Sequence, residues 1–349
     1  MLKGIDLNEL ARRITANQSL KRDYIAPSNT LRMTADSDGT TKLHVMDQGE
    51  FPILPIAHRQ LSTFVKIPAD YYDRMKADAP DLLANNVNRW FERFPVDNKR
   101  MVRTLGGDTR ALLSNSYQRI EHEHIAAVAL PILSDLKGVK IVSCEITDRR
   151  LYIHFVVETV QGEVKRGDWV QAGGIISNSE IGFGAVSVSG LLWRLECLNG
   201  MKSGHTFRRA HVGRQVEDSE ALWADDTKKA DDHAVLLKVR DMVKAVVDET
   251  SFKQNLLKMQ GLVDPKITGN IQKSVEVLSN TVGLPSSMQG DILQSLAAGG
   301  DLSAWGMLNA VTQQAHKATN YDDAVEIEAA GGALLNLAPG EWQRILVAA

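Results

Sequence analysis

The residues best suited to chemistry in this sequence are arginines and lysines interleaved with aromatic side chains. Residues 89–119 contain seven Lys and Arg against three Asp and Glu, and Trp90, Phe91, Phe94 and Tyr117 lie among them. Cations neutralise phosphates and flat rings stack on bases, so this combination is typical of single-stranded nucleic-acid binding. In the alternative interpretation, Trp90 and Phe91 fill the core beside their helix and the arginines only face water.

Further basic residues lie outside this segment, at residues 149–150, 165–166 and 208–214. Arginine suits a phosphate site because its planar guanidinium pairs with phosphate through two hydrogen bonds and stacks on bases. We expect DNA-backbone contacts from ten cations: Arg100, Arg103, Arg110, Arg149, Arg150, Lys165, Arg166, Arg208, Arg209 and Arg214. Tyr117 and Phe183 are the expected stacking residues.

Polar residues and glycines crowd residues 177–188, just before an apolar run at 191–195. We interpret this stretch as the junction between a strand and a helix. Free backbone N–H groups at such a helix start could hold an anion. Alternatively, Ser or Asn caps the helix and the glycines only permit close packing.

No motif in the sequence indicates an enzyme. The phosphate-binding pattern GxxxxGK[ST] is absent, and Gly182 and Gly184 form only a lone GxG. Residues 121–124 read Glu-His-Glu-His, but histidines two positions apart on a helix project in different directions and share a metal poorly. Cys144 and Cys197 are too few for a metal knuckle, and such residues are usually small and buried. We therefore expect no catalytic residue, no metal and no cofactor.

Composition favours a globular protein of a reducing compartment. The 349 residues are 44% hydrophobic and 24% charged, with a mean hydropathy of −0.19. No apolar stretch is long enough to span a membrane, and the N-terminal segment lacks the apolar core of a secretory signal. Because two cysteines make no disulfide framework, we expect a cytoplasmic protein without membrane contact.

The two parts of the chain differ in charge. Residues 1–214 carry 29 Lys and Arg against 24 Asp and Glu, whereas residues 215–349 carry 11 against 19. Such a change of sign is typical of a domain boundary and weakly indicates a polyanionic partner for the basic part. We expect residues 1–214 to form the nucleic-acid-binding domain and residues 215–349 to form an oligomerisation or partner-binding domain.

Hydrophobic patterning predicts an α+β fold with an antiparallel meander. Helices are expected at residues 5–20, 68–94, 122–136 and 184–198. Strands are expected within 29–65 and at 101–105, 110–114, 139–147, 151–160 and 169–177, with Gly106 and Gly107 turning a hairpin. The last three strands and the helix after them give a β-β-β-α core, and an all-helical region is expected after residue 214.

Four segments resemble a known family of phage- and plasmid-borne proteins. They read RALLSNSY at 110–117, ISNSEIG at 176–182, LECLNGM at 195–201 and RRAHVG at 208–213. Together they are similar to the family catalogued as domain of unknown function 932, from about residue 50 to the C-terminus. That family has no assigned activity, so the resemblance implies chiefly a mobile genetic element in a bacterial host cell.

The expected meander with basic hairpin tips is more distantly similar to single-strand annealing proteins of the Red-beta/RecT/Erf type. The resemblance implies a homo-oligomer, as a ring or helical filament, that holds single-stranded DNA without a nucleotide cofactor. The acidic helical region lies outside that core. We therefore expect a non-enzymatic single-stranded DNA-binding and strand-annealing protein of a phage or plasmid. The alternative is a self-assembling or host-defence-inhibiting interaction protein of a mobile element.

Overall fold

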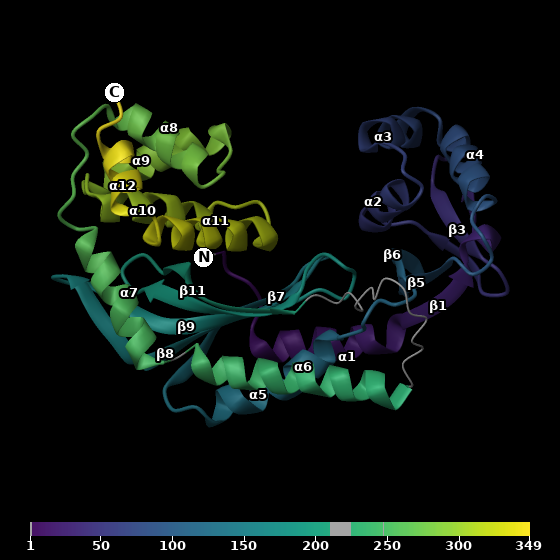
Figure 1. Cartoon of the computed structure of the whole chain (residues 1–349), viewed down its shortest axis with the longest axis horizontal. Helices are drawn as coiled ribbons and strands as arrows, with labels where there is room; N and C mark the ends of the chain where they lie inside the picture. Colours follow the sequence, from purple (N-terminus) through teal and green to yellow (C-terminus); the bar gives the residue numbers. More distant parts are fainter. Residues whose placement is uncertain (1, 210–224, 247) are drawn as a thin grey trace.

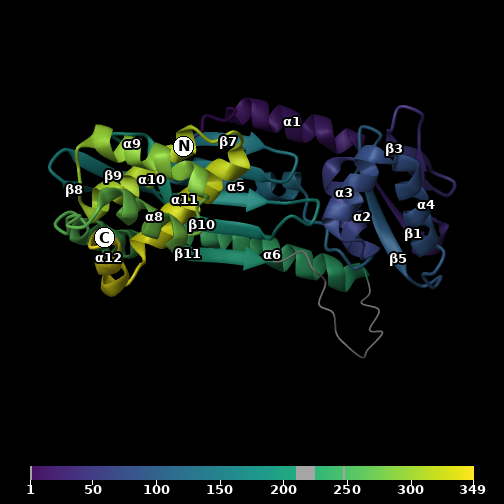
Figure 2. The same cartoon turned by 90° about the horizontal axis from the view of Figure 1, so that it is seen from above.

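The computed structural model has a mixed α+β fold, shown in Figure 1, as the sequence predicts. It describes residues 2–209, 225–246 and 248–349, with the side chains of residues 204–229 and 232 left out of the description. The sheets are antiparallel, and the described chain after residue 224 is mostly helical. An N-terminal lobe lies at one end of a five-stranded sheet, and helices cover both faces of that sheet (Figures 1 and 2).

The N-terminal lobe contains two small sheets and three helices. Its elements are β1 (Lys21–Pro27), β5 (Lys99–Leu105) and β6 (Asp108–Ser114) in one sheet, β2 (Arg32–Ala35), β3 (Thr41–Val45) and β4 (Gly49–Pro52) in the other, and α2 (Pro55–Phe64), α3 (Ala69–Asp78) and α4 (Pro80–Phe91). Gly106 and Gly107 turn the predicted β5–β6 hairpin with positive φ angles, which glycine adopts without strain. The expectation of strands and loops throughout 29–65 is wrong at its end, because Pro55 begins helix α2.

Helix α4 packs one face into the core of this lobe. Leu83, Val87 and Phe91 follow helical spacing and are fully buried. Trp90 lies on the other side of the helix and is 43% exposed, with the Arg93 guanidinium 5.4 Å from its ring centre. The core interpretation is therefore confirmed for Phe91 and wrong for Trp90.

The central sheet is a five-stranded antiparallel meander with its strands in sequence order. These are β7 (Val139–Ile146), β8 (Leu151–Lys165), β9 (Asp168–Asn178), β10 (Val186–Arg194) and β11 (Asn199–Arg209). The three strands predicted between 139 and 177 are confirmed. Because the sheet is covered on both faces, its strands are apolar on both sides over much of their length.

The helix predicted at 184–198 is wrong, since this segment forms strand β10. Nearly every residue of β10 is buried, so its apolar run lacks the alternation that marks a half-exposed strand. Gly190 stands opposite Ser203 of β11, where a Cβ atom would lie 1.9 Å from the Ser203 Oγ. The expected β-β-β-α core is thus a meander of five strands.

Helices from both parts of the chain cover this sheet. Helices α1 (Leu7–Leu20), α5 (His122–Asp135) and α6 (Asp225–Ala245) pack on one face, and α1 and α5 match the predicted helices. Helices α7 (Glu249–Gly261), α8 (Ile271–Thr281), α9 (Gln289–Gly299), α10 (Ala304–Gln313), α11 (Tyr321–Leu335) and α12 (Pro339–Leu346) share a core with strand residues of the other face (Figure 1).

The hydrophobic cores do not divide at residue 214. Val170, Leu192 and Met201 of the sheet share one core with Trp305 and Leu308 of α10. The N-terminal lobe instead has a core of its own, formed by residues between 26 and 112. Within the described ranges, no helix combines the length and apolar character needed to cross a membrane.

Candidate nucleic-acid interface

The antiparallel meander sorts the predicted site residues between two ends of the sheet. Residues 147–150, 179–185 and 208–209 lie at the end that meets the N-terminal lobe, which we call the loop end (Figure 2). Residues 165–168 and 195–198 turn the chain at the opposite end, which we call the turn end. Strand β8 joins the two ends with 15 residues, which separates them by about 45 Å at 3.3 Å per residue.

The loop between β9 and β10 is held by hydrogen bonds from several elements. Tyr117 Oη donates to the Ser179 carbonyl at 3.1 Å and accepts the Gly182 N–H at 3.2 Å. Gln60 of α2 donates to the Ile181 carbonyl at 2.7 Å. Ser179 Oγ accepts the Phe183 N–H at 3.0 Å, inside the same loop. Since its backbone groups are occupied by protein partners, this segment is a rigid loop and not the anion-binding helix start that was one of the two expectations.

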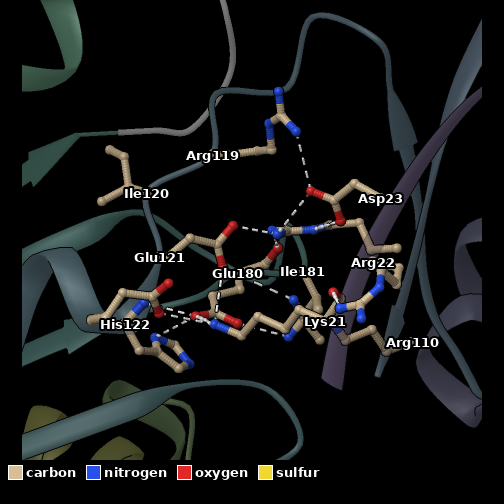
Figure 3. A network of polar contacts seen from close by, with 12 residues as sticks. Lys21, Arg22, Asp23, Arg110, Arg119, Ile120, Glu121, His122, Glu180 and Ile181 are labelled. Carbon is tan, nitrogen blue, oxygen red and sulfur yellow. Dashed lines mark hydrogen bonds and ion pairs between the residues drawn. The ribbon is translucent and has the colours of Figure 1, made fainter. Parts of the chain in front are cut away.

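A buried network of charges lies beneath this loop (Figure 3). Lys21 Nζ of β1 lies 2.6 Å from Glu180 and 3.1 Å from both Glu121 and Glu123. Arg110 of β6 reaches Glu180 at 2.7 Å. The network joins the first sheet of the N-terminal lobe to α5 and to the β9–β10 loop. Its carboxylates therefore fix the position of the loop end against the lobe.

Opposite charges keep the central groups of this network ionised. Burial by itself disfavours the Glu180 carboxylate. The neighbouring His122, Arg110 and Lys21 outweigh burial and hold its pKa well below the usual range. Burial likewise opposes the charge of Lys21, and Glu180 and Glu121 raise its pKa above the ordinary value. Burial and the neighbouring Glu180 raise the pKa of Glu121. Of the two carboxylates Glu121 and Glu180, Glu180 therefore keeps its negative charge to the lower pH.

The same three glutamates come close enough to share a metal ion. One carboxylate oxygen from each of Glu121, Glu123 and Glu180 lies within 4.8 Å of the others. The Lys21 ammonium contacts all three carboxylates, so it supplies the positive charge between them. The histidines of the 121–124 run do not join this set as a pair. His122 is buried against Asn178, whereas His124 is exposed and accepts the Glu121 N–H as part of a helix cap.

Cations and one aromatic ring also lie at the loop end of the sheet. The Arg149 guanidinium lies 5.3 Å from the centre of the Phe183 ring. Arg150 Nε donates to the Phe183 carbonyl at 3.1 Å, so both arginines of the β7–β8 turn contact this residue. Arg119 is half exposed, and its guanidinium reaches Asp23 at 3.3 Å. We call Phe183, Arg149 and Arg150 the loop platform.

Two of the arginines expected to touch DNA are buried in the network instead. Arg103 is 1% exposed and binds Asp23, Glu121 and the Glu180 carbonyl. The Arg110 side chain is 11% exposed and pairs with Glu180. A phosphate cannot reach a guanidinium that is enclosed by its own carboxylates, so both residues are structural here. Tyr117 is also committed to the loop through its hydroxyl, and burial raises its pKa well above the usual range.

The remaining expected residues are spread over the molecule. Arg100 lies in the N-terminal lobe with its guanidinium 3.8 Å from the Phe64 ring centre. Lys165 and Arg166 lie at the turn end, where Lys165 pairs with Asp301 at 2.6 Å. The backbones of Arg208 and Arg209 pair with Ser187 and Val186 at the loop end, and their side chains are not described. Arg214 lies outside the described residues. The described residues of the expected set therefore do not form one continuous surface.

Sequence reasoning missed the carboxylates that neutralise the arginines. Glu180 lies in the polar stretch at 177–188, and Glu121 and Glu123 lie in the Glu-His-Glu-His run. Both segments had been singled out in the sequence, but their place in a charge network around Lys21 had not been predicted. Lys21 and Asp23 have no local signal, because strand pairing across some 80 residues brings β1 beside β5.

In comparisons with known proteins, no protein-family model, no curated protein and no solved structure matches the chain.

Proposed function

We propose that this chain binds single-stranded DNA at the loop end of its sheet and, as a homo-oligomer, promotes annealing of complementary strands. The observation that carries the proposal is the loop platform, in which Arg149 lies against the Phe183 ring on a loop fixed by four neighbouring segments. A ring and cations on a rigid support match the needs of sequence-independent strand binding.

Chain topology supports the same end of the sheet. Strand β11 ends there at Arg208 and Arg209, beside the loop that carries Phe183. Arg119 lies on the segment that leads into α5, and its guanidinium shares Asp23 with the network. Five arginines therefore belong to segments at the loop end: Arg119, Arg149, Arg150, Arg208 and Arg209.

The proposal includes no nucleotide cofactor, because annealing needs only that DNA backbones be held while bases pair. Membership of the family of unknown function 932, a phage or plasmid origin and a bacterial cytoplasm remain parts of this proposal, supported by the sequence segments that resemble that family.

The test measures the binding of fluorescein-labelled oligo(dT) by anisotropy in low salt. Phe183→Ala should weaken binding by roughly tenfold, within the 1–3 kcal/mol that one stacked base contributes. Trp169→Ala is the matched control, since Trp169 is an exposed aromatic of the turn end, on β9. Arg149→Glu should weaken binding, whereas Arg166→Glu, at the other end of β8, should not. Equal losses from both ends, or no binding by the unmodified chain, would refute the proposal.

A second measurement tests annealing itself. Complementary oligonucleotides carrying a fluorophore and a quencher should pair faster with the protein than without it, in the absence of ATP. Light scattering after size exclusion should give a mass above that of one chain. Binding without faster pairing would leave a strand-binding protein and reject the annealing step.

One observation favours the alternative, a protein–protein contact. An open apolar cavity of about 260 Å³ lies between α5 and α6, lined by Ala127, Val128, Pro131, Ile132, Leu236 and Leu237 together with His233 and Arg240. In that interpretation the partner is a second copy of this chain. A dimer that is lost in Leu236→Glu, in a chain that does not bind oligonucleotides, would favour this function over strand binding.

A further inference from the structure

A second cavity lies at the turn end, far from the loop platform. Its open volume is about 260 Å³, and it is bounded by the β8–β9 and β10–β11 turns and by helices α9 and α10. Cys197 lines it from the β10–β11 turn and is partly exposed. Nothing in the proposed DNA-binding function uses this cavity.

The Cys197 sulfur accepts two hydrogen bonds. Arg194 Nη1 donates to Sγ at 3.1 Å, and Gln313 Nε2 of α10 donates at 3.3 Å. Arg194 is itself fixed by a two-point pair with Asp168 at 2.6 and 2.9 Å. A partly exposed sulfur beside a guanidinium is the setting in which nucleophilic cysteines occur in proteins.

The other cysteine, Cys144, serves as an internal control for the reactivity of Cys197. That thiol is fully buried in β7, and burial raises its pKa to about 12. It is therefore protonated and out of reach of solutes in the folded protein. The two cysteines should differ sharply in reactivity.

The cavity also contains polar groups that lack partners. Asn309 lines it and is 6% exposed, and its Oδ1 has no hydrogen-bond partner among the described residues. Six charged side chains line the cavity: Lys165, Arg166, Arg194, Asp168, Glu196 and Asp301. Lys165 pairs with Asp301, and Arg194 pairs with Asp168 and Glu196, which leaves Arg166 without an ion pair to a described residue. A fitting ligand brings an N–H donor for Asn309 and an anionic group for Arg166.

We propose that Cys197 is a modification site for small anionic peptide disulfides of the oxidised-glutathione class. Such a molecule carries amide N–H groups, carboxylates and a disulfide, which correspond to Asn309, Arg166 and the Cys197 sulfur. A cavity of about 260 Å³ suits one arm of the molecule, being close to the lower limit of about 300 Å³ for small-molecule sites.

The reaction is thiol–disulfide exchange. The Cys197 thiol loses its proton to solvent, and its sulfur attacks one sulfur of the disulfide. A new S–S bond joins Cys197 to one arm, the original S–S bond breaks, and the other arm leaves as a thiolate that takes a proton from solvent. The disulfide is the oxidant. The Cys197 thiolate supplies the electron pair of the new S–S bond, and the electron pair of the broken bond leaves with the other arm, so no further reactant is needed.

The first experiment incubates the folded chain with oxidised glutathione and measures the intact mass, followed by peptide mapping. One glutathionyl group should be found, on Cys197, and none on Cys144. Cys197→Ser should take up none in the folded state, while Cys144→Ala should take up one. After unfolding in denaturant, the unmodified chain should react at both thiols. Modification of Cys144 at a similar rate, or none at Cys197 in a chain that reacts fully when unfolded, would overturn the proposal.

The second experiment tests the two recognition features. Gln313→Leu removes one donor to the sulfur and should slow the reaction. Arg166→Glu should slow the reaction with oxidised glutathione by roughly tenfold, the lower range of electrostatic rate effects, and should speed the reaction with the cationic disulfide cystamine. Arg74→Glu reverses another exposed charge, on α3 outside the cavity, and is the control. A rate that responds alike to Arg166→Glu and Arg74→Glu would show that the cavity does not select anions.

Discussion

The Lys21 ammonium on β1 lies 2.6 Å from the Glu180 carboxylate on the β9–β10 loop, across 159 residues of sequence. Both side chains are mostly enclosed, at 11% and 2% exposure. Glu121 and Glu123 contact the same ammonium, so one lysine bridges three carboxylates. The pair therefore connects the N-terminal lobe to the loop that carries Phe183.

Replacing Lys21 by Met should strongly destabilise the chain. Removal of one partner from a buried ion pair costs about 3–5 kcal/mol, because the other charges stay buried without compensation. The measurement is the free energy of unfolding in urea, followed by circular dichroism.

Lys42→Met is the control for this substitution. Lys42 pairs with Asp36 at 2.6 Å, but both side chains are partly exposed, and water screens such pairs so that they contribute little to stability. Equal losses from the two lysine variants would mean that the network contributes no more than a surface pair does.

Local patterns in the sequence predicted the elements but not the partners of their charged residues. The Gly106–Gly107 turn and helix 122–136 were predictable because turn chemistry and apolar spacing are local. Strand β10 was not, because burial on both faces removes the alternation that identifies strands. Arg103 and Arg110 were predicted to bind DNA on charge alone, and only long-range strand pairing places Asp23 and Glu180 against them.

The salt dependence of DNA binding should reflect the arginines that the loop end gathers. Five phosphate contacts on single strands give a slope of about −3.5 in log K against log salt, whereas the ten cations expected from the sequence give about −7. Fluorescence anisotropy between low and moderate salt measures this slope. A slope near the larger value would mean that cations away from the loop end also contact the strand, contrary to the distribution described above.

Stability should fall as the pH drops from about 6.5 towards 4. Burial, aided by Lys76, lowers the pKa of His58 to about 4, and burial lowers that of His122 to about 4. The unfolded chain takes up protons at these histidines near pH 6.5, but the folded chain does so only near pH 4. Their stabilising contribution is therefore complete above pH 6.5 and is lost through this window, by about 3 kcal/mol for each histidine.

Urea unfolding at a series of pH values measures this effect. His58→Gln removes one of the two histidines that take up a proton on unfolding. The slope of unfolding free energy against pH between 6.5 and 5 should therefore fall by about the contribution of one proton. His124→Gln, at an exposed position of α5, should leave the slope unchanged. A slope that is the same in all three proteins would contradict the assignment to buried histidines.

The C-terminal helices should depend on a buried pair between β8 and α11. His154 Nε2 lies 3.1 Å from Glu328 Oε2, neither side chain is exposed, and Tyr321 Oη lies 2.9 Å from His154 Nδ1. Glu328→Ala leaves the imidazole without its partner, which should cost roughly 1–3 kcal/mol, the penalty of an unsatisfied buried polar group. Glu326→Ala, two residues away on the exposed face of the same helix, should cost little. In a double-mutant cycle with His154→Ala, the losses should not add, since each single change already breaks the contact. Additive losses would show that the two side chains stabilise the chain independently.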